Sequence, residues 1–110
     1  MTMKFDKFDE HVLVDDQWLK CPVCGETYLH QGRVIVFNRD EDDPETVETH
    51  VSSNSLRQRK IQSEDSNNPS GRRHGLTIEF TCEHHEGTMH LQIAQHKGCT
   101  LLSWRTPVVD

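Results

Sequence analysis

Two short motifs hold the residues of this sequence that are best suited to chemistry. The first is Cys21-Pro-Val-Cys24-Gly25, in which Pro and Gly favour a tight turn that brings the two thiols together. The second is Cys82-Glu-His-His85, a partial copy of the first. Three thiolates and one imidazole form a ligand set that suits a tetrahedral zinc ion. The spacing therefore predicts one structural zinc ion per chain, held by Cys21, Cys24, Cys82 and His85.

The fourth ligand has two alternatives. His84 is adjacent to His85, and Cys99 would complete a four-thiolate site if the last hairpin folded back over the metal. Iron would require that four-thiolate set. The first Cys-x2-Cys pair could instead be redox-active, because such a pair at the start of a helix has a lowered thiol pKa. The Gly that follows the pair and the β-rich continuation argue against a helix there.

The composition predicts a small domain with a limited core. The chain has 110 residues, of which 33% are hydrophobic, and the apolar residues are concentrated in short segments. A core of this size usually needs a metal or a disulfide for stability. We expect one β domain over residues 17–106, with a loosely ordered segment at 1–16 and a tail at 107–110. No segment resembles a membrane span or a secretory signal, so we expect a cytoplasmic protein with reduced cysteines.

Alternating apolar residues in the last third of the chain predict antiparallel strands. His90 falls on the opposite face of this pattern and is expected to be solvated. His96-Lys-Gly98 predicts a hairpin turn in which Gly98 takes the positive φ. With no helical pattern, we expect an all-β antiparallel domain of roughly five or six strands, with the metal at one end. The residues expected on the core faces are Leu76, Ile78, Phe80, Cys82, Met89, Leu91 and Ile93.

Residues 39–73 form a polar stretch rich in Ser, Asn and Asp, which we expect to be an insert or loop in the domain. Part of it alternates between Val or Thr and charged residues and is followed by Ser-Ser-Asn-Ser, which predicts a hairpin. In that hairpin Glu48 and His50 would face Arg57 or Arg59, where opposite charges on paired strands stabilise the pair.

The two motifs resemble those of the zinc-ribbon superfamily, in which two knuckles on β-hairpins bind one zinc ion beside a short antiparallel sheet. Over roughly residues 20–105 the chain is also similar to a group of small bacterial and phage-type zinc-ribbon proteins with no established activity. It departs from the usual second Cys-x2-Cys by having His at position 85. The resemblance implies the metal and the fold, and no reaction. The similar residues are Cys21-Pro-Val-Cys24-Gly, Tyr28-Leu-His30, Val36-Phe37, Asn68-Pro-Ser, Arg72-Arg73, Phe80-x-Cys82-Glu, Gln95-His-Lys-Gly98 and Trp104.

Three classes of function follow from the resemblance and the charges. Zinc ribbons commonly dock on proteins or nucleic acids, and the net charge of −6 favours a protein partner. A metal-dependent hydrolase would need an open metal position and a carboxylate base such as Glu83 or Glu86, whereas three-thiolate sites are usually structural. We therefore favour a non-enzymatic protein-interaction module, and exposed edge strands would also permit a dimer. The alternative nucleic-acid interface would use the basic residues Arg57, Arg59, Lys60, Arg72 and Arg73.

Overall fold

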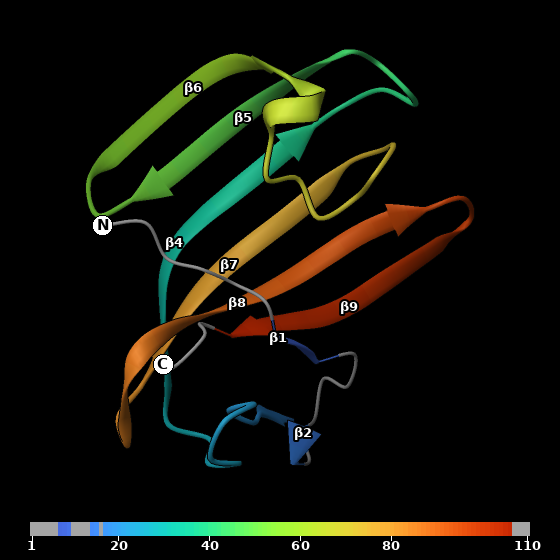
Figure 1. Ribbon diagram of the computed structural model, residues 1–110. Coiled ribbons are helices and arrows are strands. Elements are labelled where there is room, and N and C mark those ends of the chain that lie inside the picture. The colour runs from blue at the N-terminus through green and yellow to red at the C-terminus, as the bar shows by residue number, and fades with distance from the viewer. Residues whose placement is uncertain (1–6, 10–13, 16, 107–110) are drawn as a thin grey trace.

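The structure is a computed structural model that describes residues 7–9, 14–15 and 17–106. It contains a seven-stranded antiparallel sheet in the order β1-β9-β8-β7-β4-β5-β6 and a two-stranded sheet of β2 and β3 (Figure 1). This confirms the all-β antiparallel prediction, with more strands than expected. The elements are β1 (Lys7–Asp9), β2 (Val14–Asp15), β3 (Trp18–Leu19), β4 (Leu29–Asn38), β5 (Glu45–Ser52), β6 (Ser55–Gln62), the 3₁₀ turn η1 (Ser63–Asp65), β7 (Gly75–Cys82), β8 (His85–His96) and β9 (Cys99–Thr106).

Most of the predicted loosely ordered segment 1–16 and the whole predicted tail 107–110 lie outside the described residues. Within the described part of the chain, no helix has the length and apolar character needed to cross a membrane.

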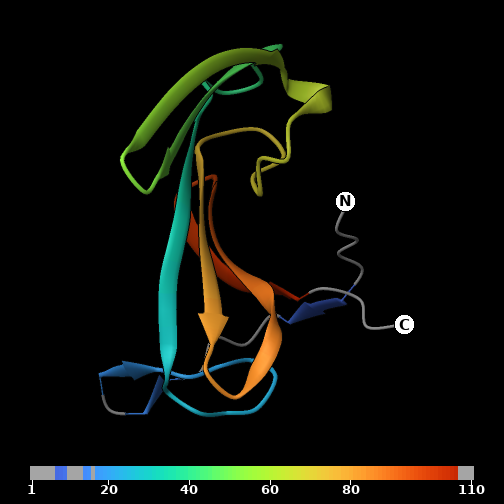
Figure 2. The same cartoon turned by 90° about the vertical axis from the view of Figure 1, so that its left-hand side faces the viewer.

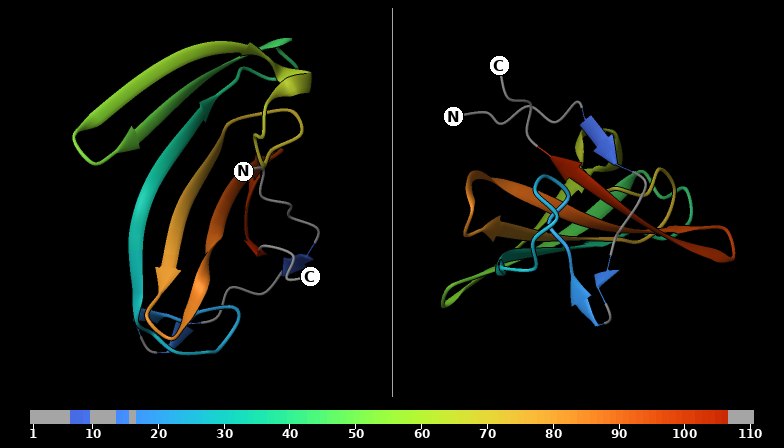
Figure 3. Two further views of the ribbon diagram at one scale, coloured as in Figure 1. Left: turned by 60° about the vertical axis from the view of Figure 1, so that its left-hand side comes forward. Right: turned by 90° about the horizontal axis from the view of Figure 1, so that it is seen from below.

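Two meanders build the large sheet. Strands β4, β5 and β6 follow one another in space, as do β7, β8 and β9, and β4 pairs with β7 to join the two sets. The sheet is curved, and segment 63–74 lies on its concave side (Figure 2). Loop 20–28 and the small sheet lie at one end of the curve, and the β5–β6 hairpin lies at the other (Figure 3).

The β5–β6 hairpin occupies the middle of the polar stretch 39–73. Its register pairs Glu48 with Arg59 and His50 with Arg57, which confirms the predicted facing of opposite charges. Asn54 in the turn has a φ of 55°, a left-handed conformation that Asn tolerates better than most residues. This stretch therefore contributes two strands to the main sheet.

A buried carboxylate ties segment 63–74 to the hairpin. Glu48 is only 2% exposed, and its oxygens accept hydrogen bonds from His50 (2.9 Å), Arg59 (3.0 Å) and the Ser66 hydroxyl (2.7 Å). Burial raises the pKa of Glu48, but these hydrogen bonds outweigh burial and leave the pKa below its ordinary value. The carboxylate is therefore held in its charged form and fixes the position of the segment.

The hydrophobic core lies at the end of the sheet that carries Cys82 and His85, which we call the metal end because these residues are predicted ligands. Its aromatic centre is the pair Phe80 and Trp104, whose rings meet edge to face with their centroids 5.7 Å apart. This half of the sheet follows the predicted pattern, because β7 and β8 bury the face that the sequence assigned to the core. The buried residues of this cluster are Cys21, Phe80, Cys82, Met89, Leu91 and Trp104.

In the other half of the sheet, the opposite face is buried. Thr77 is 2% exposed and Gln92 is 4% exposed, although the alternation placed both on the polar face. Segment 63–74 lies over this face and approaches so closely that a Cβ on Gly75 would lie 2.1 Å from the Asn68 side-chain oxygen, and the Ser70 hydroxyl donates to the Gln95 carbonyl oxygen at 2.8 Å. The same face carries the buried Phe37, so each half of the sheet has its own buried side.

Two local predictions were wrong. His90 is not solvated: its side chain is 15% exposed and lies 3.4 Å from Glu79, which also binds Arg33. Burial is the main reason that the pKa of His90 is lowered. In the β8–β9 turn, the positive φ belongs to Lys97, at 55°, and not to Gly98.

Candidate metal centre

Four side chains converge beside loop 20–28 and the turn between β7 and β8. The ligand atoms of Cys21, Cys24, Cys82 and His85 all lie within 4.8 Å of one another, so this group could hold one metal ion. The Cys21 sulfur lies 3.1 Å from His85 Nε2, and the sulfurs of Cys24 and Cys82 are 3.6 Å apart. The four cysteines of the chain are free thiols, which leaves all three sulfurs of the group available to a metal.

A tight turn presents the first two ligands. The N–H of Gly25 donates to the Cys21 carbonyl oxygen at 2.9 Å, and the N–H of Cys21 donates to the carbonyl oxygen of Glu26 at 2.7 Å. Gly25 has a φ of +79°, as predicted from its place after the second cysteine. The N–H of Val23 points at the Cys21 sulfur at 3.4 Å, a contact that stabilises negative charge on the sulfur.

A hairpin presents the other two ligands. Cys82 ends β7, His85 begins β8, and the two are register partners across a two-residue turn. The N–H of His84 approaches the Cys82 sulfur at 3.5 Å, which repeats the contact made in the first turn. His85 Nδ1 lies 2.9 Å from the Glu86 carbonyl oxygen, so this nitrogen carries the proton and Nε2 is free to bind a metal.

The surroundings of Cys82 and Cys24 shift the pKa values of the two thiols in opposite directions. Burial raises the pKa of the Cys82 thiol to about 11. Cys24 is exposed, and a backbone hydrogen bond from Glu26 is the main cause that lowers its pKa. A metal ion at this site must therefore displace the proton of a buried thiol, as metals that bind thiolate generally do.

The two alternative fourth ligands lie outside this group. The His84 ring packs edge to face against Tyr28, with the ring centroids 5.4 Å apart. Cys99 is exposed and pairs with His96 at the far end of β8, which is 12 residues long. Because a strand rises about 3.3 Å per residue, Cys99 lies tens of ångströms from His85.

The basic residues proposed for nucleic acid are largely engaged with carboxylates. Arg72 lies 2.7 Å from Asp42, and both Arg72 and Arg73 contact Glu41. Arg59 binds the buried carboxylate on the neighbouring strand. The remaining two are Arg57 and Lys60, which alternate to opposite faces of β6.

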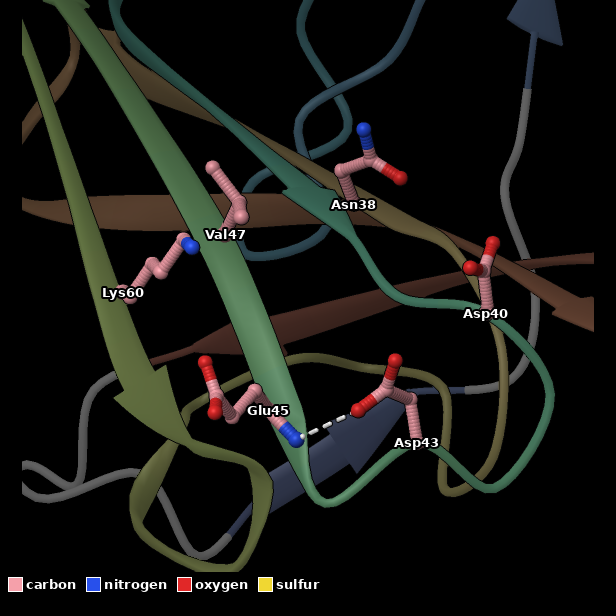
Figure 4. A pocket seen from close by; sticks show the side chains of 6 residues that line it. All are labelled: Asn38, Asp40, Asp43, Glu45, Val47 and Lys60. Carbon is pink, nitrogen blue, oxygen red and sulfur yellow. Dashed lines mark hydrogen bonds between the residues drawn. The ribbon is translucent and has the colours of Figure 1, made fainter.

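The structure also contains an open pocket that the sequence pattern does not predict. Asp40 and Asp43 approach it from the β4–β5 connection, Glu45 from the start of β5, and the Lys60 amine from β6 (Figure 4). The run of acidic residues from Asp40 to Asp43 is visible in the sequence. Its position near Lys60 is not, because that depends on the pairing register of the hairpin. The pocket lies on the hairpin and is separate from the metal centre.

Comparisons of the chain with models of known protein families, with curated proteins and with solved structures find no match.

Proposed function

We propose that this protein binds one structural zinc ion in a zinc-ribbon arrangement and acts as a protein-interaction module. The observation that carries the proposal is the convergence of three thiols and one imidazole in two similar turns. In each turn the first cysteine receives an N–H from the residue two positions later, as expected of two knuckles. Two sulfurs at about 2.3 Å from a tetrahedral zinc are about 3.8 Å apart, and the Cys24–Cys82 separation of 3.6 Å fits that requirement.

The donor set supports a structural ion over a catalytic one. Four protein ligands fill the tetrahedral shell of zinc, whereas a catalytic zinc keeps one position open for water or substrate. Glu83, one of the carboxylates considered as a base, is exposed and lies 3.3 Å from His30. We therefore assign the metal to the stability of the fold, where it joins loop 20–28 to the β7–β8 hairpin.

The charges support a protein partner over nucleic acid. Nucleic-acid binding needs a concentrated positive surface, and Arg59, Arg72 and Arg73 are paired with acidic residues of the chain itself. By contrast, β6 is an open edge of the sheet, and such an edge is ready to bind another chain.

Elemental analysis and native mass spectrometry test the metal assignment. The expected result is one zinc per chain, lost in Cys21→Ser and weakened in His85→Ala. Cys99→Ser is the matched control, because Cys99 is exposed and distant, and it should retain the zinc. A folded protein that carries no zinc would contradict the proposal. The partner class is tested with oligonucleotides at low salt, where a salt-dependent affinity lost in an Arg72→Ala and Arg73→Ala double variant would favour nucleic acid instead.

A further inference from the structure

We infer that the open edge of β6 binds an extended segment of a partner protein in which acidic and apolar residues alternate. The inference rests on the proposed function and specifies the interaction surface and the chemistry of the partner. Three observations lead to it: the direction of the backbone groups on β6, an apolar row that begins at its edge, and the charges that the strand carries.

The backbone of β6 directs every second peptide group away from the sheet. Among the described strands β6 pairs only with β5. The N–H of Ser63 donates to the Pro44 carbonyl oxygen at 2.7 Å, which fixes the phase of the ladder. Since antiparallel pairs alternate between bonded and non-bonded positions, the odd-numbered residues of β6 face β5. The N–H and C=O groups of Leu56, Gln58 and Lys60 therefore point outward and can pair with a further strand.

An apolar row starts at this edge and crosses the sheet. Leu56 is 69% exposed and its register partner Val51 is 43% exposed. Val51 pairs with Val34, and Val34 pairs with Ile78, which packs against the core of the metal end. The row lies on the face opposite segment 63–74. An incoming strand would place its own apolar side chains beside Leu56 and continue the row.

The charges of β6 select an acidic partner. The strand carries three cations and no acidic residue. Arg57 makes no ion pair within the described part of the chain, and its side chain lies on the face opposite the apolar row. A partner strand that alternates apolar and acidic residues would place its apolar side chains beside Leu56 and a carboxylate opposite Arg57. Near the other end of β6, Lys60 lines a pocket together with the carboxylates of Asp43 and Glu45 (Figure 4), so the acidic residues of the partner belong near the turn.

A second copy of the chain fits this edge poorly. Antiparallel pairing of β6 with itself would place cations of the two strands opposite or close to one another, and like charges in that position are destabilising. Cationic side chains on edge strands also discourage such self-pairing in natural proteins.

The experiment titrates the zinc-loaded protein with a short blocked peptide of alternating valine and glutamate, and follows backbone amides by NMR. We expect shifts and slowed hydrogen exchange at Leu56, Gln58 and Lys60. Gln58→Pro removes one outward N–H without removing a β5–β6 bond and should weaken binding at least tenfold. Gln58→Ala is the matched control and should bind as the wild type does. Arg57→Glu should weaken this peptide and favour one of alternating valine and lysine.

Three results would overturn the inference. The first is a folded protein that does not bind the peptide, and the second is equal binding by wild type and Gln58→Pro. The third is a concentration-dependent dimer that Gln58→Pro abolishes, which would make a second copy the occupant. None of these affects the proposed zinc site, which fails separately if the chain folds without metal.

Discussion

The sulfur atoms of Cys24 and Cys82 lie 3.6 Å apart and join two segments that are distant in the sequence. Cys24 belongs to the loop before β4, and Cys82 ends the strand next to β4 in the sheet. Without a metal, a buried thiol and an exposed thiol meet here with no covalent bond between them. The two sulfurs therefore join these segments firmly only if a metal ion binds both of them.

We predict that removal of the metal unfolds the protein. Structural zinc contributes about 10–16 kcal/mol of apparent binding free energy, whereas small domains have unfolding free energies of about 5–15 kcal/mol. A chelator should abolish the near-ultraviolet circular dichroism of buried Trp104, and an excess of zinc should restore it. A spectrum that the chelator leaves unchanged would contradict a structural role for the metal.

The buried Glu48 carboxylate should give the protein a specific pH dependence. Its pKa is lower in the folded state than the ordinary value of about 4.3, despite burial, because of its hydrogen bonds. Its contribution to the unfolding free energy is therefore complete above that ordinary value and is lost as the pH falls through the folded-state pKa. Glu48→Gln should lower the unfolding free energy by about 2 kcal/mol near neutral pH, and in the wild type the carboxylate should stay charged at a pH where an ordinary glutamate is half protonated.

Urea unfolding at about pH 7 measures this difference, and NMR titration of the Glu48 side-chain carboxyl follows its protonation in the zinc-loaded protein as the pH is lowered. Glu64→Gln is the matched control, because Glu64 is exposed on η1 and the same change should have little effect there. Both variants keep all the metal ligands, so their zinc content near neutral pH should be the same. A Glu48 carboxyl that takes up its proton at or above the ordinary pKa, or equal stability of the two variants near neutral pH, would contradict this prediction.

The sequence predicted the candidate site well because its determinants are local. The spacing Cys-x2-Cys and Cys-x2-His requires only a turn within each motif, and the composition of each turn was visible. The β5–β6 hairpin was predictable for a similar reason, since the facing of Glu48 and Arg59 follows from a turn at residues 52–55. The spacing alone could not exclude Cys99 and His84 as ligands. The position of Cys99 depends on where the β8–β9 hairpin ends, and that of His84 depends on its contact with Tyr28.

The buried face of each half of the sheet could not be predicted, because it depends on contacts between distant segments. Thr77 and Gln92 are buried on the face that segment 63–74 approaches, and nothing in the alternation of β7 or β8 contains that information. The position of His90 follows from its neighbours Glu79 and Arg33 on adjacent strands. Polar residues in an apparently exposed pattern were therefore misassigned where another segment covered them.

Gly75 should tolerate no side chain. A Cβ there would lie 2.1 Å from the Asn68 oxygen and 2.8 Å from the Pro69 ring. Asn68 is not free to move, because its side chain accepts from the N–H of Ser70 and donates to the carbonyl oxygen of Arg73. We predict that Gly75→Ala lowers the unfolding free energy by about 1–3 kcal/mol.

Gly71→Ala provides the matched control for this substitution. Gly71 lies in the same segment, and a Cβ there meets no atom within 4 Å, so its effect should stay within about 0.5 kcal/mol. Thermal unfolding of both variants makes the comparison, and zinc content should be unchanged in each. Equal stability of the two variants would mean that segment 63–74 does not pack on Gly75.

The turn between β8 and β9 places Lys97 where glycine would be favoured. Lys97 has a φ of 55°, which costs a residue with a Cβ about 1–2 kcal/mol. We predict that Lys97→Gly raises the unfolding free energy by about 1 kcal/mol, whereas Lys97→Ala, which removes the same charge, gives no such gain. Gly98→Ala should be tolerated, because a Cβ at Gly98 meets no atom within 4 Å. Urea unfolding measures the unfolding free energy of the three variants. If Gly98→Ala is destabilising and Lys97→Gly has no effect, Gly98 and not Lys97 is the residue with the left-handed conformation.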